Sequence, residues 1–299
     1  MNIGLISDYK KEDFISYGRP NYWDTPTGIY TALLKNPRVD KVKWYPYVGI
    51  DNPHFPYLSI LNDIEDGVFE PDIIFYLACG PQIDEYFNHK YFKNVKLVVD
   101  LGDEPQTLKF NANRAYNADL VLTPDYECYI SYKKKGYNVI HTGHFADMEV
   151  FKPNKNKIIK YDVVSTMNGT REGYIEFLNK KLNKSFVNLN GITGQQNAEL
   201  FQSSKIIFQK SRFNEITRRI FEGMATKKLV ITDMLPNNKK LDLFFRDGEE
   251  IILYKNKKDA LRKIKYFLNN PKEREEIAEK GYLKVKNYYS ATNIVNYIL

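Results

Sequence analysis

Basic and acidic side chains gather in residues 206–233 at the spacing that anion binding requires. An apolar run ends just before Lys210, and Arg219 and Glu222 come before the β-branched run 229–232. This order predicts a strand, a loop, a helix and a second strand. In open α/β sheets, the loop after a strand and the start of the next helix bind phosphate through backbone N–H groups and basic side chains. The stretch therefore predicts a ligand-binding βαβ unit.

A carboxylate one helical turn further along is placed to recognise ribose. Glu222 follows Arg219 by three residues, so the two share one face of the predicted helix. Arg218 is also a donor-site candidate, but as the neighbour of Arg219 it cannot face the same way. A carboxylate accepts hydrogen bonds from ribose hydroxyls, and phosphate together with ribose indicates a nucleotide. Thr217, just before the helix, belongs to the same predicted donor site. The alternative for Glu222 is a helix cap or a salt bridge.

A second set of candidate residues follows the predicted strand 161–165. Asn168, Gly169 and Arg171 come shortly after this strand. An arginine suits a diphosphate because its planar fork donates two hydrogen bonds at once, and Lys210 would act on the same group as a point charge. Each cation alone could form a surface salt bridge instead, but together they favour a pyrophosphate site.

Two carboxylates end a buried run in the first half of the chain. The predicted strand 96–100 leads toward Asp103 and Glu104, and Pro105 follows. At the edge of a sheet, such carboxylates bind acceptor hydroxyls or act as a general base. The same residues also fit a helix start with an acidic N-cap and a proline in the first turn. His144 is a further catalytic candidate, although a lone histidine is often structural.

A long polar and aromatic loop follows the first predicted strand, residues 2–7. It contains Tyr22, Trp23 and Asp24. Aromatic side chains stack on sugar rings or bases, which predicts acceptor binding by this loop. Packing of the two rings beneath their own loop is the alternative.

Length, composition and charge predict a globular protein of two domains. The chain has 299 residues, of which 43% are hydrophobic and 14% aromatic, enough for two cores. Residues 1–153 hold 16 Lys and Arg against 21 Asp and Glu, a balance of −5, whereas residues 154–299 hold 28 against 16, a balance of +12. A basic second half suits an acidic donor such as a nucleotide diphosphate sugar, and also an anionic surface or polymer. A solvated lysine-rich face is the alternative explanation.

Several other functions find no support in the sequence. Cys79 and Cys128 lack metal-ligand spacing and indicate reduced thiols of a cytoplasmic protein. The first apolar run is too short for the core of a signal peptide, and no stretch approaches the ~20 apolar residues of a membrane span. The four histidines are scattered, no Asp-x-Asp pair occurs, and Walker-type, zinc-protease and serine-hydrolase motifs are missing. We therefore expect neither a metal ion nor a cofactor.

Strands and helices alternate in both halves of the chain. In the first half we expect strands at 2–7, 43–47, 71–78, 96–100, 120–123 and 138–141, and helices at 27–34, 82–90, 106–117 and 126–135. In the second half we expect strands at 161–165, 185–188, 206–208, 229–232 and 251–254, and helices at 172–182, 195–203, 257–269, 271–286 and 291–298, besides the helix that carries Glu222. Such alternation predicts an α/β protein with parallel, doubly wound sheets. Pro153 and a polar run place the boundary, which gives domains of residues 1–153 and 154–290 and a C-terminal helix at 291–299.

The stretch around Glu222 also resembles the donor-site signature of GT-B glycosyltransferases, especially the family 4-like and spore-maturation-protein-like branch. That signature reads roughly R-x-x-E-A-x-A-x-G-x-x-V and is followed by an apolar strand and an Asp. The matching residues here are Arg219, Glu222, Ala225, Val230 and Asp233. Residues 145–153 resemble the interdomain segment of the same family.

Two places depart from the signature. Asn214 stands eight residues before Glu222, where many members have a first glutamate, and Glu215 is one position off. Thr226 and Lys227 replace the usual Cys-Gly turn. The nucleotide role of Glu222 is unaffected by these changes, but no sugar contact is carried over from the first glutamate.

The resemblance implies two Rossmann-like domains that face each other across a cleft. The second would bind a nucleotide diphosphate sugar, with a UDP-sugar as the expected co-substrate, Glu222 on the ribose and Arg171 and Arg219 on the pyrophosphate. The first would present the acceptor hydroxyl. A metal ion is not needed, because fixed cations and helix-start N–H groups stabilise the departing diphosphate. Family 4-like members retain the anomeric configuration and often send the last helix back to the first domain, so we expect retention and such a course for residues 291–299.

The sequence leaves the acceptor open. A saccharide or lipid-linked glycan, a hydroxymethylated pyrimidine in DNA as in phage-type enzymes, and a protein side chain are the three alternatives. The basic second half suits DNA, whereas the acidic first half does not. A non-catalytic protein that binds a nucleotide sugar or a glycan is the rival class, since a fold does not establish an activity. The oligomeric state does not follow from the sequence.

Overall fold

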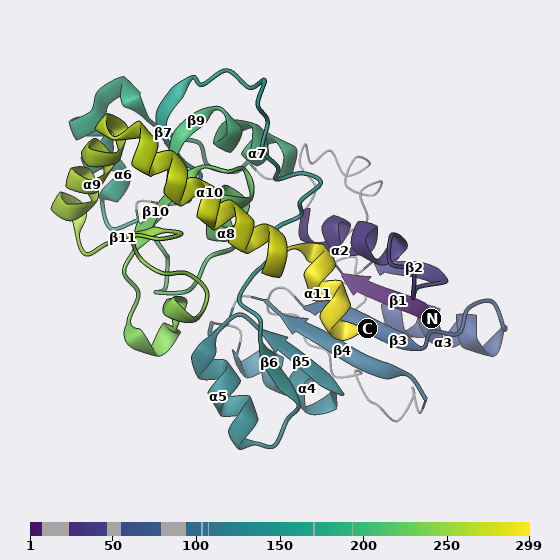
Figure 1. Cartoon of the computed structure of the whole chain (residues 1–299). Helices are drawn as coiled ribbons and strands as arrows, with labels where there is room; N and C mark the ends of the chain where they lie inside the picture. The colour runs from purple at the N-terminus through teal and green to yellow at the C-terminus, as the bar shows by residue number, and fades with distance from the viewer. Residues whose placement is uncertain are drawn as a thin grey trace. The chain divides into compact units, whose positions relative to one another are not determined.

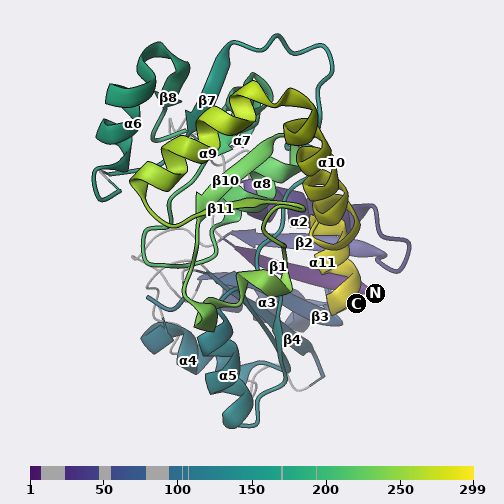
Figure 2. The same cartoon turned by 60° about the vertical axis from the view of Figure 1, so that its left-hand side comes forward.

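The chain folds into two parallel β-sheets flanked by helices (Figures 1 and 2). The computed structural model describes residues 1–7, 24–46, 55–78, 94–102, 104–106, 108–169, 171–192 and 194–299. They divide into two compact units, one of Met1–Gly143 with Ile294–Leu299 and one of His144–Asn293. Each unit contains one of the sheets, which confirms the α/β fold class.

The N-terminal unit is built on a six-stranded sheet in the order β2-β1-β3-β4-β5-β6, with parallel pairing throughout. Its strands are β1 (Asn2–Ser7), β2 (Lys41–Pro46), β3 (Ile73–Ala78), β4 (Lys96–Leu101), β5 (Leu120–Thr123) and β6 (Val139–His141). Its helices are α2 (Asp24–Leu34), α3 (Phe55–Glu65), α4 (Leu108–Asn117) and α5 (Tyr126–Lys134). Central strand residues such as Phe75 and Val98 are fully buried, which explains the unbroken apolar runs.

The C-terminal unit is built on a five-stranded parallel sheet in the order β11-β10-β9-β7-β8. Its strands are β7 (Tyr161–Ser165), β8 (Phe186–Asn188), β9 (Ser204–Phe208), β10 (Leu229–Asp233) and β11 (Ile252–Tyr254). The helices of the second half are α6 (Tyr174–Leu182), α7 (Gly194–Gln202), α8 (Arg218–Ala225), α9 (Lys257–Asn269), α10 (Pro271–Tyr288) and α11 (Ala291–Ile298). The last residues of α11 group with the N-terminal unit.

A hydrophobic core lies on each face of the C-terminal sheet. Phe221 of α8 and Val285 of α10 belong to one core, and Phe208 and Ile264 belong to the other. Helix α8 lies very close to the sheet, because a Cβ atom on Gly223 would be only 3.0 Å from side-chain atoms of neighbouring strand residues. This close contact fixes the position of the helix that carries the predicted donor residues.

Most elements match the expectation from the sequence, and one helix was missed. Helix α3 was not predicted; Pro56 lies in its first turn, where proline is tolerated. The predicted helix 82–90 lies outside the described residues. The two units meet in sequence at Gly143 and His144, before the boundary expected at Pro153.

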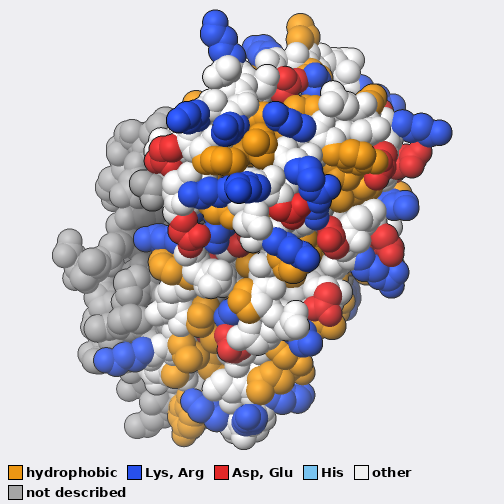
Figure 3. Space-filling model, turned by 90° about the vertical axis from the view of Figure 1, so that its left-hand side faces the viewer, with side chains coloured by type: hydrophobic (Ala, Val, Ile, Leu, Met, Phe, Trp, Pro, Cys, Tyr) orange, Lys and Arg blue, Asp and Glu red, His pale blue; other side chains and the backbone are white. Residues whose placement is uncertain are grey.

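The surface carries charge of both signs. On the face drawn in Figure 3, Lys and Arg side chains are spread widely, with acidic and hydrophobic side chains between them. On this face, the charged side chains of both signs are interspersed.

Candidate functional site

Polar residues gather at the carboxyl ends of three neighbouring strands in the C-terminal unit. β7 leads into residues 166–173, β9 leads into residues 209–217, and β10 ends at Asp233. These strands lie in the order β10-β9-β7, so their carboxyl ends meet at one edge of the sheet. The predicted donor residues lie in the first two of these segments or on α8, which follows the second.

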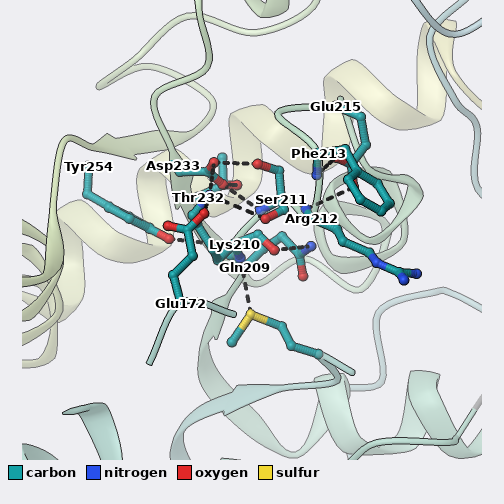
Figure 4. Close-up of polar contacts among 11 residues, drawn as sticks. Glu172, Gln209, Lys210, Ser211, Arg212, Phe213, Glu215, Thr232, Asp233 and Tyr254 are labelled. Atoms are coloured by element: carbon teal, nitrogen blue, oxygen red, sulfur yellow. Dashed lines mark hydrogen bonds and ion pairs between the residues drawn. The ribbon is translucent and has the colours of Figure 1, made fainter. Parts of the chain in front are cut away.

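Asp233 is a centre of hydrogen bonding at this edge (Figure 4). It is buried, and it accepts one hydrogen bond from the backbone N–H of Ser211 at 2.8 Å and another from the Ser211 hydroxyl at 2.5 Å. The Lys210 ammonium donates to the same carboxylate at 3.3 Å. These bonds attach the loop after β9 to the end of β10.

Lys210 is a buried cation held between two carboxylates. Its side chain is 8% exposed and pairs with Asp233, which is equally buried. Figure 4 shows Glu172 pointing toward the same group, with its carboxylate 3.8 Å from the ammonium and its side chain 71% exposed. The backbone N–H of Lys210 donates to the sulfur of Met167 at 3.2 Å. A buried charge requires a partner, and here Asp233 is the firm partner and Glu172 the weak one.

Glu215 shapes the loop between β9 and α8. Its carboxylate accepts hydrogen bonds from the backbone N–H groups of Arg212, at 3.0 Å, and of Phe213. Asn214 has a φ of 58°, a left-handed conformation that asparagine tolerates better than most residues. Arg212 extends away from Asp233 and lies over the Phe213 ring, 4.6 Å from its centroid (Figure 4). The carboxylate nearest to the family's first glutamate therefore stabilises the loop itself.

The loop after β7 holds Arg171 in an unusual backbone conformation. Arg171, Glu172 and Gly173 have positive φ values of 47°, 56° and 73°. Left-handed backbone in consecutive non-glycine residues costs free energy and often marks a functional site. The Nε of Arg171 is buried and has no hydrogen-bond partner among the described residues.

The surroundings of Arg171 are electrostatically unbalanced. Burial lowers the pKa of its guanidinium, and the positive charges of Arg219 and Arg212 lower this pKa further. Glu215 and Asp233 act in the opposite direction. Cations have thus been brought close together around a buried donor group, an arrangement that a bound anion would relieve.

Helix α8 begins beside this cluster. The Arg219 guanidinium donates through Nε to the hydroxyl of Thr166, just after β7, at 2.8 Å. Thr217 is the N-cap of α8, and its hydroxyl oxygen is buried without a hydrogen-bond partner in the described part of the chain. Arg218 is partly buried beside it. The amino end of a helix, with its free N–H groups, favours a negative ligand.

Glu222 lies one turn further along α8. It is 6% exposed and accepts a hydrogen bond from Nδ2 of Asn197, on α7, at 3.2 Å. The Oδ1 of Asn197 is buried and has no partner within the described residues. On the other side of the cluster, Asn168 and Gly169 are exposed, and Asn168 accepts from the backbone N–H of Gly191 at 3.4 Å.

The second half of the chain matches a known sequence family. Residues 157–299 match the family described as Glycosyl transferase-like. Solved structures of GT-B glycosyltransferases match the chain over its whole length. The chain has the fold of GT-B glycosyltransferases, and its second half resembles the Glycosyl transferase-like family.

Three solved structures illustrate the likeness of this fold to known proteins. HepE (Alr3699) of Anabaena, determined with UDP and glucose, is 13% identical with a TM-score of 0.63 and covers 100% of this chain and 98% of its own. A glycosyltransferase of Rickettsia africae is 13% identical with a TM-score of 0.64 and covers 99% and 96%. Sucrose-phosphate synthase of Thermosynechococcus elongatus is 11% identical with a TM-score of 0.62 and covers 100% and 97%. No curated protein sequence matches the chain.

The two catalytic candidates that the structure describes, Glu104 and His144, lie in different surroundings. Glu104 is buried in the N-terminal unit, where its carboxylate accepts hydrogen bonds from Thr123, from Tyr132 at 2.5 Å and from Asn111 at 3.3 Å. Burial raises the pKa of Glu104 to about 7, although these three hydrogen bonds lower it. His144 opens the C-terminal unit, and its ring meets that of Phe221 edge-on at 6.1 Å.

The remaining candidates lie at the edge of the described residues or outside them. Asp103, Tyr22 and Trp23 lie outside the residues that the structure describes. Asp24 begins α2, and nothing is described of its side chain. Within the described ranges, no group of three or more His, Cys, Asp or Glu residues could hold a metal ion. Nor does any helix there have the length and apolar character to cross a membrane.

The structure adds partners that the sequence did not single out. Asp233 entered the sequence analysis only as the end of the signature, yet it ties together Ser211 and Lys210. A carboxylate at the carboxyl end of a buried strand was the signal for it. Asn197 and Thr166 gave no such signal, because they come from other elements and meet the glycosyltransferase signature only in the folded unit.

Proposed function

We propose that this enzyme transfers a sugar from a UDP-sugar to an acceptor hydroxyl. HepE, a structural neighbour across the full chain, has been determined with UDP and with UDP-glucose. The observation that carries the proposal is the unpartnered, buried Nε of Arg171 close to the charges of Arg219 and Arg212. Such a group is suited to a diphosphate, whose oxygens accept from planar guanidinium forks.

Each donor-site residue has a part in this proposal. Arg171 and Arg219 bind the diphosphate, and Thr217 and the first N–H groups of α8 add hydrogen bonds to it. Lys210 contributes by exchanging its weak contact with Glu172 for a phosphate oxygen, while Asp233 keeps it in place. Glu222 accepts from the ribose hydroxyls.

The proposed reaction breaks the bond between the sugar C1 and the diphosphate oxygen. The acceptor oxygen forms a new bond to C1, its proton passes to an oxygen of the leaving diphosphate, and we propose that the anomeric configuration is retained. Negative charge grows on the leaving diphosphate, so fixed cations stabilise the transition state more than the bound donor. Arg171, Arg219 and the start of α8 supply the positive charge that stabilises the leaving diphosphate, without a metal ion.

We propose a saccharide as the acceptor. The residues before Asn154 carry a balance of −5, which is unfavourable for contact with DNA, so a hydroxymethylated pyrimidine in a duplex is the second choice. Binding to duplex DNA that falls steeply with salt would favour that second choice.

Nucleotide binding tests the donor site directly. We expect UDP and UDP-glucose to raise the melting temperature of the protein, by the equivalent of about 2.7 kcal/mol at a concentration 100 times Kd. Arg171→Ala and Arg219→Ala should each weaken UDP binding by roughly 10- to 100-fold, since each removes a charge-assisted hydrogen bond. Lys181→Ala, a change of an exposed lysine on α6, is the matched control and should bind UDP normally.

Slow donor hydrolysis separates an enzyme from a binding protein. The purified protein should release UDP from UDP-glucose, and Glu222→Ala should lose this activity together with nucleotide affinity. Binding of UDP-glucose without any turnover, in the presence or absence of saccharides, would support the non-catalytic alternative. Equal melting temperatures with and without nucleotides would contradict both.

A further inference from the structure

An open groove of about 1020 Å³ lies at the other end of the C-terminal sheet. Ser204 and Leu229, the first residues of β9 and β10, line it together with Pro271 at the start of α10. The proposed donor site follows the carboxyl ends of these same strands. The groove and the donor site are therefore separated by the length of the sheet, and a ligand in one does not compete with a ligand in the other.

The groove is lined by an excess of cations. Six lysines and one arginine face three glutamates in its wall. Four of the cations pair with a carboxylate, for example Lys205 with Asp162 at 2.6 Å. Lys155, Lys228 and Lys272 form no salt bridge with another residue that the structure describes. The groove thus offers positive charge that the protein itself does not neutralise.

The positive charge of Lys228 is electrostatically unfavourable in its surroundings. It is partly buried, and burial lowers the pKa of its ammonium. The positive charge of Arg274 lowers this pKa further, while Glu275 opposes it. Arg274 is itself buried and donates to the backbone carbonyl of Phe267 at 3.0 Å, which fixes its position in the wall. An anion at this place would offset the repulsion between the two cations.

Two isoleucines stand exposed beside these cations. Ile158 is 74% exposed and Ile159, which lines the groove, is 42% exposed. They lie between Lys157 and Lys160, after a turn in which Asn154 accepts from the backbone N–H of Asn156 at 3.1 Å. Exposed aliphatic side chains flanked by lysines suit the boundary between lipid headgroups and acyl chains. A soluble polyanion would gain nothing from the isoleucines.

We propose that the groove, together with residues 155–160, is a contact site for a membrane surface rich in anionic phospholipid. The lysines bind the phosphate headgroups, and Ile158 enters the interfacial layer. The lining contains no aromatic residue and only one arginine, which disfavours single-stranded nucleic acid, because bases stack on aromatic rings. The proposal goes beyond sugar transfer and does not depend on it.

Sedimentation with vesicles tests the contact site. The full-length protein should bind vesicles of phosphatidylcholine mixed with phosphatidylglycerol, should bind less as salt is raised, and should not bind phosphatidylcholine alone. A basic residue near an anionic surface adds roughly fivefold to partitioning, so Lys155→Glu with Lys272→Glu should weaken binding by at least about 25-fold. Ile158→Ser should weaken it roughly tenfold through lost apolar burial. All three side chains are exposed, so the variants should fold normally.

Matched controls decide between this site and general charge. Lys180→Glu with Lys181→Glu makes the same change of charge on α6, outside the groove, and Leu243→Ser removes another exposed aliphatic side chain. Both controls should bind vesicles nearly as the wild type does, and the groove variants should keep the donor hydrolysis of the wild type in solution. Equal losses in groove and control variants would overturn the proposal. The proposal would also be overturned if the groove variants lost binding to heparin but bound vesicles as the wild type does.

Discussion

Single residues in the proposed donor site differ in how far their charge is already satisfied. Lys210 has a firm partner in Asp233, so its charge is largely used within the protein. The Nε of Arg171 has no partner among the described residues, and both cations (Arg219, Arg212) and carboxylates (Glu215, Asp233) act on its guanidinium. A bound diphosphate would therefore gain most from Arg171. The buried pair of Lys210 and Asp233 serves mainly to hold the loop that a ligand would meet.

Glu104 is the residue for which the structure gives the clearest dependence on pH. It accepts three hydrogen bonds in the buried interior of the N-terminal unit. Burial raises its pKa in the folded state to about 7, from 4.5 in the unfolded chain. The folded state therefore binds the proton more tightly. The resulting stability is complete below pH 4.5 and is lost as the pH rises through about 7.

We predict that Glu104→Gln removes this pH dependence. A shift of this size corresponds to roughly 3 kcal/mol in the free energy of unfolding. The variant should gain up to that amount over the wild type at pH 8 and little at pH 5, as measured by urea unfolding of the N-terminal unit. Glu65→Gln, at an exposed position, should leave the curve unchanged. A parallel offset of the Glu104→Gln curve at all pH values would contradict the assigned pKa.

At the scale of elements, α10 is positioned by a glycine in its interior. A Cβ atom on Gly281 would lie 2.6 Å from the backbone carbonyl oxygen of Glu250 and 3.4 Å from Met224 of α8. Glycine weakens a helix by about 1 kcal/mol relative to alanine, so its presence here requires a reason. The reason is the close approach of the helix to the chain before β11.

We predict that Gly281→Ala destabilises the C-terminal unit by roughly 1 to 3 kcal/mol, because the added methyl group cannot be accommodated by rotation of a side chain. Urea unfolding of the protein, with and without UDP, would measure the loss. Lys280→Ala, next to it on the exposed side of α10, should be neutral or slightly stabilising. An increase in stability for Gly281→Ala would show that helix propensity outweighs the contact.

The elements were predicted from the sequence more completely than the side chains that meet between them. Buried parallel strands have a strong apolar pattern, so β3, β4 and β10 could be located from composition alone. The bonds from Arg219 to Thr166 and from Asn197 to Glu222 join residues far apart in the chain, and no local pattern encodes them. Glu215 bonds to backbone N–H groups only two and three residues away, so its support of the loop is a local feature that the comparison with the family signature passed over.

At the scale of the whole molecule, the chain forms two units with separate cores. The N-terminal unit is made of two separate stretches of the sequence. Unit one takes its last residues, Ile294–Leu299, from the far end of the sequence. Within that unit, the Lys96 ammonium donates to the backbone carbonyl of Ile298 at 3.2 Å, and Asn36 donates to Asn296 at 3.1 Å. Ile294 and Ile298 are at most 2% exposed. The end of α11 therefore helps to stabilise the N-terminal unit.

Removal of residues 294–299 should consequently destabilise the N-terminal unit, although the rest of that unit lies far from them in the sequence. We predict that the truncated chain loses several kcal/mol from the N-terminal unit, since three apolar side chains, among them Val295, lose their burial at roughly 1.5 to 3 kcal/mol each. Limited proteolysis should then cut residues before Gly143 first, while UDP affinity of the C-terminal unit stays within about twofold of the wild type. Tyr297→Ala, at a side chain that is 60% exposed, is the control and should resist proteolysis as the wild type does. If cleavage instead began between His144 and Asn293, the result would contradict this prediction, because the last residues of α11 would then stabilise the C-terminal unit.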